Sequence, residues 1–168
     1  TAGLATDSTG HLYVALDTYS SDFPGATNSV STGPDIVVAK ISQAASTVLF
    51  ATYIGGSGTD TRGSLALDGS GHIYLSGRTT SPALPIPDPS RAIRTSLPNG
   101  APADGLLARL SPSGTLQYLT YLGGSGSDSA EAIAVSGTKV YVSGSASSSD
   151  LPVTGTSAQA SFGGEFDA

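Results

Sequence analysis

Two acidic, glycine-rich strings are the first residues in this chain that could hold a metal ion. They read GGSGTD at 55–60 and GGSGSD at 123–128, and each matches GGxGxD, the core of the calcium-binding nonapeptide repeat. Such repeats follow one another every nine residues and carry a large apolar residue at their eighth position. Here the strings lie 68 residues apart, with Arg62 and Ala130 at the eighth position. This spacing argues against a calcium β-roll.

The same strings can be interpreted as connecting loops. An apolar, strand-like run precedes each of them, TVLFATYI at 47–54 and TLQYLTYL at 115–122. Glycine suits a crowded connection because it tolerates positive φ, and the closing aspartate is expected to accept backbone N–H bonds in the turn. We therefore expect no cofactor, and Asp60 and Asp128 are the candidate ligands if calcium binds.

The histidines are a second place where a metal could bind. His11 and His72 are the only two, and they occupy turn positions 61 residues apart that are equivalent in the repeat described below. A metal could be shared between the two turns. However, we find no acidic or second-histidine partner at a fixed short spacing. Both are expected to be exposed turn residues.

Catalytic arrangements are poorly supported by the residue types present. The string GGSGT lacks the strand–Ser–helix context of a nucleophile elbow, and no Lys-Ser/Thr follows the glycines as in a phosphate-binding loop. Asp60, Asp128 and Glu131 could supply paired carboxylates for glycoside cleavage, but recurring turn positions already account for the two aspartates. We predict no catalytic or cofactor-binding residues and expect that the protein is not an enzyme.

The loop at 82–103, PALPIPDPSRAIRTSLPNGAPA, is the most individual segment of the chain. Its prolines favour a stiff, extended backbone, and Arg91 and Arg94 are the only close basic pair. Loops on rigid scaffolds commonly carry binding residues. Arg91 and Arg94 are therefore the candidate partner-binding residues; the alternative is that the loop merely covers part of the domain.

Composition excludes several classes of partner. The 168 residues carry a net charge of −6 and only seven Lys and Arg, so there is no basic footprint for nucleic acid or anionic lipid. No apolar stretch approaches the roughly 18 residues that span a bilayer. The absence of Cys excludes disulfides and thiolate metal sites. Tyr, Phe, Val and Ile gather in short runs, which favours a folded, turn-rich β protein over disorder.

An internal repeat of about 60 residues organises the chain. GLATDSTGHLYVALDT at 3–18 aligns with SLALDGSGHIYLSGRT at 64–79, and AIAVSGTKVYVSGSAS at 132–147 is a third copy with a shorter turn. After a variable loop, DIVVAKIS at 35–42 corresponds to DGLLARLS at 104–111. Equivalent strings in equivalent order indicate equivalent structural units.

Each unit predicts four short strands. They are LATD, HLYVALD, DIVVAKI and TVLFATYI in the first unit, and LALD, HIYLSG, GLLARL and TLQYLTYL in the second. DSTG and DGSG bridge the first two strands, where Asp and Gly suit a type I turn. Four strands per unit without helical periodicity are typical of propeller blades. Tyr13, Tyr74 and Tyr141 recur on the second strand and are expected to pack between blades.

The combined motifs resemble a known repeat. The strings LALDGSGHIYLSG, SSDFP at 20–24, SSDLP at 148–152, DIVVAKI, STVLFATYIGGSGTD and GTLQYLTYLGGSGSD together are similar to the SBBP-type bacterial β-propeller repeat family. The departures are His11 and His72 where Asn is usual, and the shortened turn SGTK at 136–139. The resemblance implies a secreted or surface-displayed bacterial protein with a propeller scaffold, and it implies no common reaction.

The repeat and the resemblance together predict an all-β fold of four-stranded antiparallel propeller blades. We expect one propeller segment over 1–168, with blade 1 at about 3–56, blade 2 at about 63–124 and a partial blade 3 at about 131–168. About two and a half blades cannot close a ring alone. We therefore expect either that the chain is a segment of a longer propeller or that copies associate through exposed blade edges.

The predicted function is that of a non-catalytic, extracellular or cell-surface scaffold, or of a protein- or glycan-binding surface. Two alternatives remain open at this stage. The chain could be an architectural part of a larger propeller enzyme whose active site lies elsewhere, or a subunit of a self-assembling surface filament that grows by edge pairing. The flanking sequence would separate the first two hypotheses, and concentration-dependent size in solution would favour the third.

Overall fold

The computed structural model describes residues 3–28, 33–153, 159 and 163–164. These residues contain no helix, and hence none long and apolar enough to cross a membrane. The strands, in chain order, are β1 (Gly3–Thr6), β2 (Leu12–Thr18), β3 (Asp35–Ile41), β4 (Val48–Ile54), β5 (Asp60–Leu67), β6 (Ile73–Thr79), β7 (Asp104–Leu110), β8 (Leu116–Leu122), β9 (Asp128–Ser136) and β10 (Lys139–Ala146).

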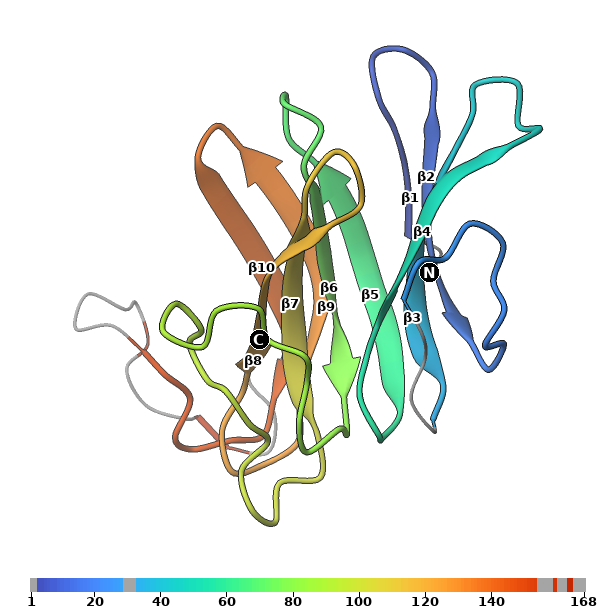
Figure 1. Ribbon diagram of the computed structural model, residues 1–168. Coiled ribbons are helices and arrows are strands. Elements are labelled where there is room, and N and C mark those ends of the chain that lie inside the picture. The colour runs from blue at the N-terminus through green and yellow to red at the C-terminus, as the bar shows by residue number, and fades with distance from the viewer. Residues whose placement is uncertain (1–2, 29–32, 154–158, 160–162, 165–168) are drawn as a thin grey trace.

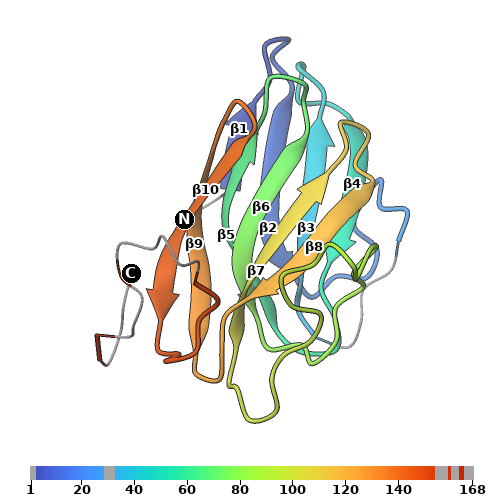
Figure 2. The ribbon, with the colours of Figure 1, turned by 90° about the vertical axis from the view of Figure 1, so that its left-hand side faces the viewer.

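The strands form three open antiparallel sheets that lie side by side (Figures 1 and 2). The first sheet has the order β1-β2-β3-β4, the second sheet β5-β6-β7-β8, and the third sheet pairs β9 with β10. The prediction of an all-β fold is thus confirmed, and so is the expectation of four strands in each of the first two units. The last part of the third predicted unit, including 165–168, lies outside the described residues.

The turn chemistry explains how the first two strands of each unit meet. In the β1–β2 turn the Asp7 carboxylate accepts the backbone N–H of Thr9, while Gly10 donates to the Asp7 carbonyl at 3.0 Å and adopts a φ of 83°. The β5–β6 turn repeats this arrangement with Asp68 and Gly71, whose φ is 80°. Because only glycine adopts positive φ without strain, each turn ends where the sequence places Gly.

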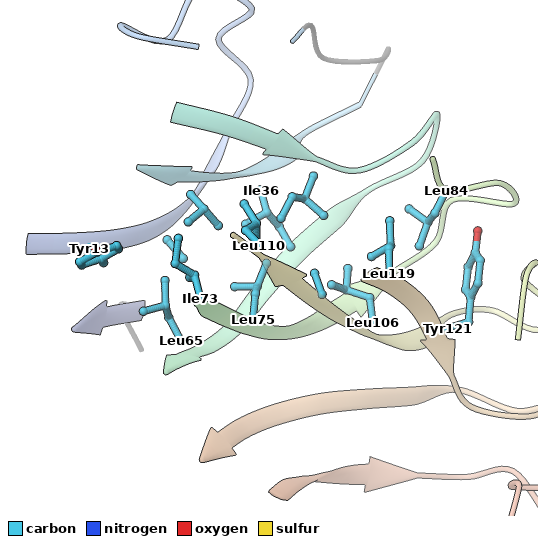
Figure 3. Close-up of a cluster of buried hydrophobic side chains, with 14 residues drawn as sticks. Tyr13, Ile36, Leu65, Ile73, Leu75, Leu84, Leu106, Leu110, Leu119 and Tyr121 are labelled. Carbon is cyan, nitrogen blue, oxygen red and sulfur yellow. The ribbon is translucent and has the colours of Figure 1, made fainter. Parts of the chain in front are cut away.

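Each sheet has two distinct faces because side chains alternate along a strand. We call the face toward the following sheet the forward face and the other the rear face. On the first sheet, the forward face carries Tyr13, Ala15, Ile36 and Val38, and on the second sheet the rear face carries Leu65, Ile73, Leu75, Leu106, Ala108 and Leu110. These residues, with Ile54, Leu84, Leu119 and Tyr121, are buried in one cluster (Figure 3). The main core therefore lies between two sheets.

We call the interface between the first and second sheets the first seam, and that between the second and third sheets the second seam. The second seam has the same arrangement of strands as the first, with smaller side chains. The inner strand β9 contacts β5, β6 and β7, just as β5 contacts β1, β2 and β3. A Cβ on Gly63 would lie 2.8 Å from the Glu131 carbonyl and closer still to that of Ala130. A Cβ on Gly105 would lie 3.1 Å from the Ala130 backbone nitrogen. Glycine at these two positions lets the two sheets approach closely.

The three recurring tyrosines share a local setting but not the same exposure. Tyr13 is 1% exposed and lies 4.9 Å below Lys40 Nζ, and Tyr74 is half-buried with the Arg109 guanidinium 5.8 Å from its ring. Tyr141, at the equivalent place on β10, is 54% exposed. No described sheet follows the third sheet, so the predicted packing of Tyr141 between sheets stays a prediction.

Two buried tyrosines on the fourth strands anchor the variable loops. The Tyr53 hydroxyl donates to the Ser20 carbonyl and accepts the Phe23 N–H, both at 2.8 Å. The equivalent Tyr121 hydroxyl donates to the Ser81 carbonyl at 2.8 Å. Each hydroxyl thus satisfies backbone groups in the loop that leaves the second strand of its sheet.

The Tyr53→Phe substitution is expected to lower the free energy of unfolding by about 1–2 kcal/mol, because it leaves two backbone groups of the loop without their partner. Chemical denaturation followed by circular dichroism measures this difference. Tyr19→Phe is the matched control, since Tyr19 is 86% exposed and its substitution should change stability by less than about 0.5 kcal/mol. Equal effects of the two substitutions would contradict the anchoring role.

Candidate functional site

The two glycine-rich strings are the connections between successive sheets. GGSGTD leads from β4 into β5, and GGSGSD leads from β8 into β9, so that Asp60 and Asp128 open the inner strand of the next sheet. Both aspartates are buried. The Gly56 N–H donates to Asp60 Oδ2 and the Gly124 N–H donates to Asp128 Oδ2, each at 2.8 Å. The expectation that these carboxylates accept backbone N–H bonds in the turn is confirmed.

Each of these aspartates lies beside a second buried carboxylate from the preceding sheet. Asp35 opens β3 and Asp104 opens β7, and they are 1% and 0% exposed. A Cβ placed on Gly123 would lie 2.7 Å from Asp128 Oδ2 and closer still to Asp104 Oδ1. A Cβ on Gly55 would meet Asp60 Oδ2 and Asp35 Oδ1 in the same way. We call these two arrangements the carboxylate pairs, Asp35–Asp60 and Asp104–Asp128.

The two members of the Asp104–Asp128 pair differ in how they are satisfied. Asp128 accepts four hydrogen bonds, from the backbone N–H groups of Gly124, Ser147 and Ser148 and from the Ser148 hydroxyl. Neither carboxylate oxygen of Asp104 has a hydrogen-bond partner. Burial away from water, together with the neighbouring charge of Asp128, raises the pKa of Asp104 to about 7, although Arg94 acts in the opposite direction.

Sequence reasoning assigned no role to Asp35 or Asp104. A signal was present, because each is a carboxylate at the head of an otherwise apolar strand, in DIVVAKI and DGLLARL, at equivalent places in the repeat. A buried carboxylate normally requires a partner. The partner itself could not be read from the sequence, since it comes from the next sheet, 24 or 25 residues further on.

The histidines are not the exposed turn residues that the sequence predicted. Both are partly buried, and each imidazole lies near an aspartate four residues earlier, with His72 Nδ1 3.0 Å from Asp68 Oδ2 and His11 Nδ1 3.2 Å from Asp7 Oδ2. Each histidine therefore has an acidic partner at a short spacing, contrary to the expectation from the sequence. The hydrogen bond from Thr9, followed by those from the His11 backbone and Lys40, holds the pKa of Asp7 well below its usual range.

The histidine sites do not have the geometry of a nucleophile relay. The Thr9 hydroxyl lies 2.7 Å from His11 Nδ1, the same ring nitrogen that faces Asp7. In a catalytic triad the nucleophile and the carboxylate contact opposite ring nitrogens. A groove of about 550 Å³ lies between the two turns and is lined by Asp7, Lys40 and Asp68, among others.

The other predicted acidic site residues do not converge. Glu131 is exposed and accepts hydrogen bonds from the hydroxyls of Ser129 and Ser145, at 3.0 and 3.3 Å. Asp60 lies at the seam between the first two sheets, and Asp128 at the next seam. Within the described residues no group of three or more His, Cys, Asp or Glu side chains is arranged to hold a metal ion.

The two arginines of the 82–103 loop face different surroundings. Arg94 is half-buried, and its backbone pairs with the edge of β8, donating to Thr120 Oγ1 at 3.1 Å and accepting the Tyr121 N–H at 3.3 Å. Its positive charge favours the ionised form of Asp104 and so acts to lower the pKa of that carboxyl group. Arg91 is exposed, and its positive charge contributes to the lowered pKa of Asp88. The loop thus covers part of the β8 edge, and binding of a partner by these arginines stays a prediction.

Comparison with known proteins adds no family assignment. No protein-family model matches the chain, and no curated protein is similar enough to it to show a relationship.

Proposed function

We propose that the three sheets are successive blades of a β-propeller of the SBBP type, and that the protein is a non-catalytic scaffold or protein- or glycan-binding surface, secreted or displayed on a bacterial cell. The observation that carries this proposal is the repetition of one packing plan at two successive seams. At each seam the forward face of one sheet meets the rear face of the next, and a GGSGxD loop makes the connection. Radial repetition of this kind builds propellers.

The faces at the two ends of the stack are only partly covered, and their exposed parts define the partner. The rear face of the first sheet exposes Leu4, 57% accessible, with Val14 and Leu16 half-buried beside it. The forward face of the third sheet exposes Tyr141. Because every seam joins a forward face to a rear face, these two surfaces are complementary in kind. Further sheets of the same repeat, in the same protein or in a second copy, would cover both.

Head-to-tail association of the 168-residue chain is the expected result, since such an interface uses two different surfaces and can propagate. Sedimentation velocity over a wide concentration range should show a mass that rises with concentration. Tyr141→Glu should keep the chain monomeric by placing a charge in the interface. Tyr19→Glu, which changes an equally exposed tyrosine on a loop, should associate like the unmodified protein.

Two outcomes would contradict head-to-tail association through these faces. A chain that stays monomeric at the highest concentration would show that a second copy does not cover these faces. Association that persists in Tyr141→Glu would place the interface elsewhere. Negative-stain images of the associated material then separate closed rings, which the propeller requires, from open fibres, which would support the filament alternative.

A further inference from the structure

At each seam a buried carboxylate has at least one oxygen atom without a hydrogen-bond partner. At the second seam, Asp104 is fully buried and neither of its oxygens has a hydrogen-bond partner. At the first seam, Asp60 Oδ1 is buried and without a partner as well. Nearly all buried polar groups in native proteins are satisfied by protein, water or ions. Unsatisfied carboxylate oxygens thus occur at both seams, on Asp60 in the first pair and on Asp104 in the second, and they point to a bound group that supplies the missing contacts.

The excess of negative charge is best documented at the second seam. The negative charges of Asp128 and Asp150 both raise the pKa of Asp104. Arg94 is the only positive group among those that change this pKa. Asp150 is itself held by the backbone and hydroxyl of Ser125, at 2.7 and 2.9 Å. The local charge is thus negative, and removing carboxylates from water without compensation costs several kcal/mol per ion.

A shared proton accounts for this arrangement less well than a cation. A proton on Asp104 would satisfy one of its two oxygens and leave the other without a donor. The neighbouring Asp128 accepts four hydrogen bonds from the protein. A cation can contact both oxygens of one carboxylate, and metal-ligating carboxylates are commonly held by such hydrogen bonds to the surrounding protein.

We propose that each carboxylate pair, Asp104–Asp128 and Asp35–Asp60, binds one Ca²⁺ ion that bridges two successive sheets. Calcium suits these sites because it takes oxygen ligands in flexible geometry, including backbone carbonyls and water beside carboxylates. One carboxylate of each pair opens the third strand of a sheet, and the other opens the inner strand of the next. The ion would therefore tie two sheets together at the loop that connects them, whether or not the sheets form a propeller.

The unmodified chain, stripped with a chelator and titrated with Ca²⁺ alone at pH 8 and low ionic strength, is expected to bind two ions in calorimetry. Because the ions bind only the folded state, calcium at 100 times the dissociation constant should raise the melting temperature by about 5–10 °C for each site, or about 10–20 °C for both. Mg²⁺, which demands a stricter octahedral geometry, should raise it less.

Replacing the proposed aspartate ligands with asparagine, an amide of the same shape, identifies the calcium sites. Asp104→Asn should reduce the stoichiometry from two to one, and the double variant Asp35→Asn/Asp104→Asn should reduce it to none and abolish the thermal shift. Asp22→Asn is the matched control, because Asp22 is an exposed aspartate on the loop after β2. It should keep both ions.

The proposal is overturned if the stripped, unmodified chain binds no calcium. It is also overturned if the double Asn variant binds as many ions as the unmodified chain. Failure of a variant to fold does not obscure the result, because the stoichiometry and thermal shift of the unmodified chain test the proposal directly. Absence of binding combined with a more stable Asp104→Asn variant would assign a proton to the pair instead.

Discussion

Replacing Ile36 with alanine is expected to lower the free energy of unfolding by about 2–5 kcal/mol, the usual cost of a cavity in a packed core. The Ile36 side chain has no exposed surface and projects from the first sheet into the cluster formed with the second (Figure 3). A Cβ on Gly77 of the second sheet would lie 3.3 Å from Ile36 Cδ1. The substitution therefore removes contacts between sheets as well as within one.

Urea denaturation followed by circular dichroism measures this loss. Ile93→Ala removes the same atoms from an isoleucine that is 53% exposed on the 82–103 loop, and should change stability by about 0.5 kcal/mol or less. If the two substitutions had equal effects, the core would not lie between the first two sheets.

The second large effect concerns pH in metal-free protein. The folded pKa of Asp104 is raised to about 7 from an ordinary value of 3.8, so the folded chain binds its proton more tightly than the unfolded chain. The stabilisation of the folded state by this proton is complete below pH 3.8, and it is lost as the pH rises toward 7. Over this range Asp104 alone should lower the free energy of unfolding by at most about 4 kcal/mol.

Asp104→Asn removes this ionisation and should flatten the profile between pH 4 and 7 in the presence of a chelator. At pH 8 the variant should be more stable than the unmodified chain, because no buried charge remains at that position. Denaturation midpoints at several pH values measure both effects, with Asp22→Asn as the control. An unchanged slope in Asp104→Asn would show that Asp104 is not the titrating group.

Local structure could be predicted from the repeat because it depends on neighbouring residues. The predicted strands DIVVAKI at 35–41 and TLQYLTYL at 115–122 correspond to β3 and β8 to within a residue. The turns that begin at Asp7 and Asp68 end at a glycine of positive φ, as the residue types required. The acidic partners of His11 and His72 also lie only four residues earlier in the sequence, contrary to the expectation that no partner lay at a short spacing.

The carboxylate pairs show the limit of this reasoning. Asp60 and Asp128 were singled out from their loops, whereas Asp35 and Asp104 were aligned with each other but given no role. The sequence of a single strand does not indicate which carboxylate of another sheet will lie beside its own aspartate. That proximity arises only when β3 and β5, or β7 and β9, are brought together.

The amino-acid sequence by itself determined the all-β character, the order of the strands and the chemistry of the turns, because periodicity and backbone preference act over a few residues. The tertiary structure decided which faces are covered. Tyr13 and Tyr141 occupy the same position in their units, yet one is buried and the other is exposed. The physical reason is that burial depends on the neighbouring sheet, and a repeated sequence specifies its own surfaces without specifying what lies against them.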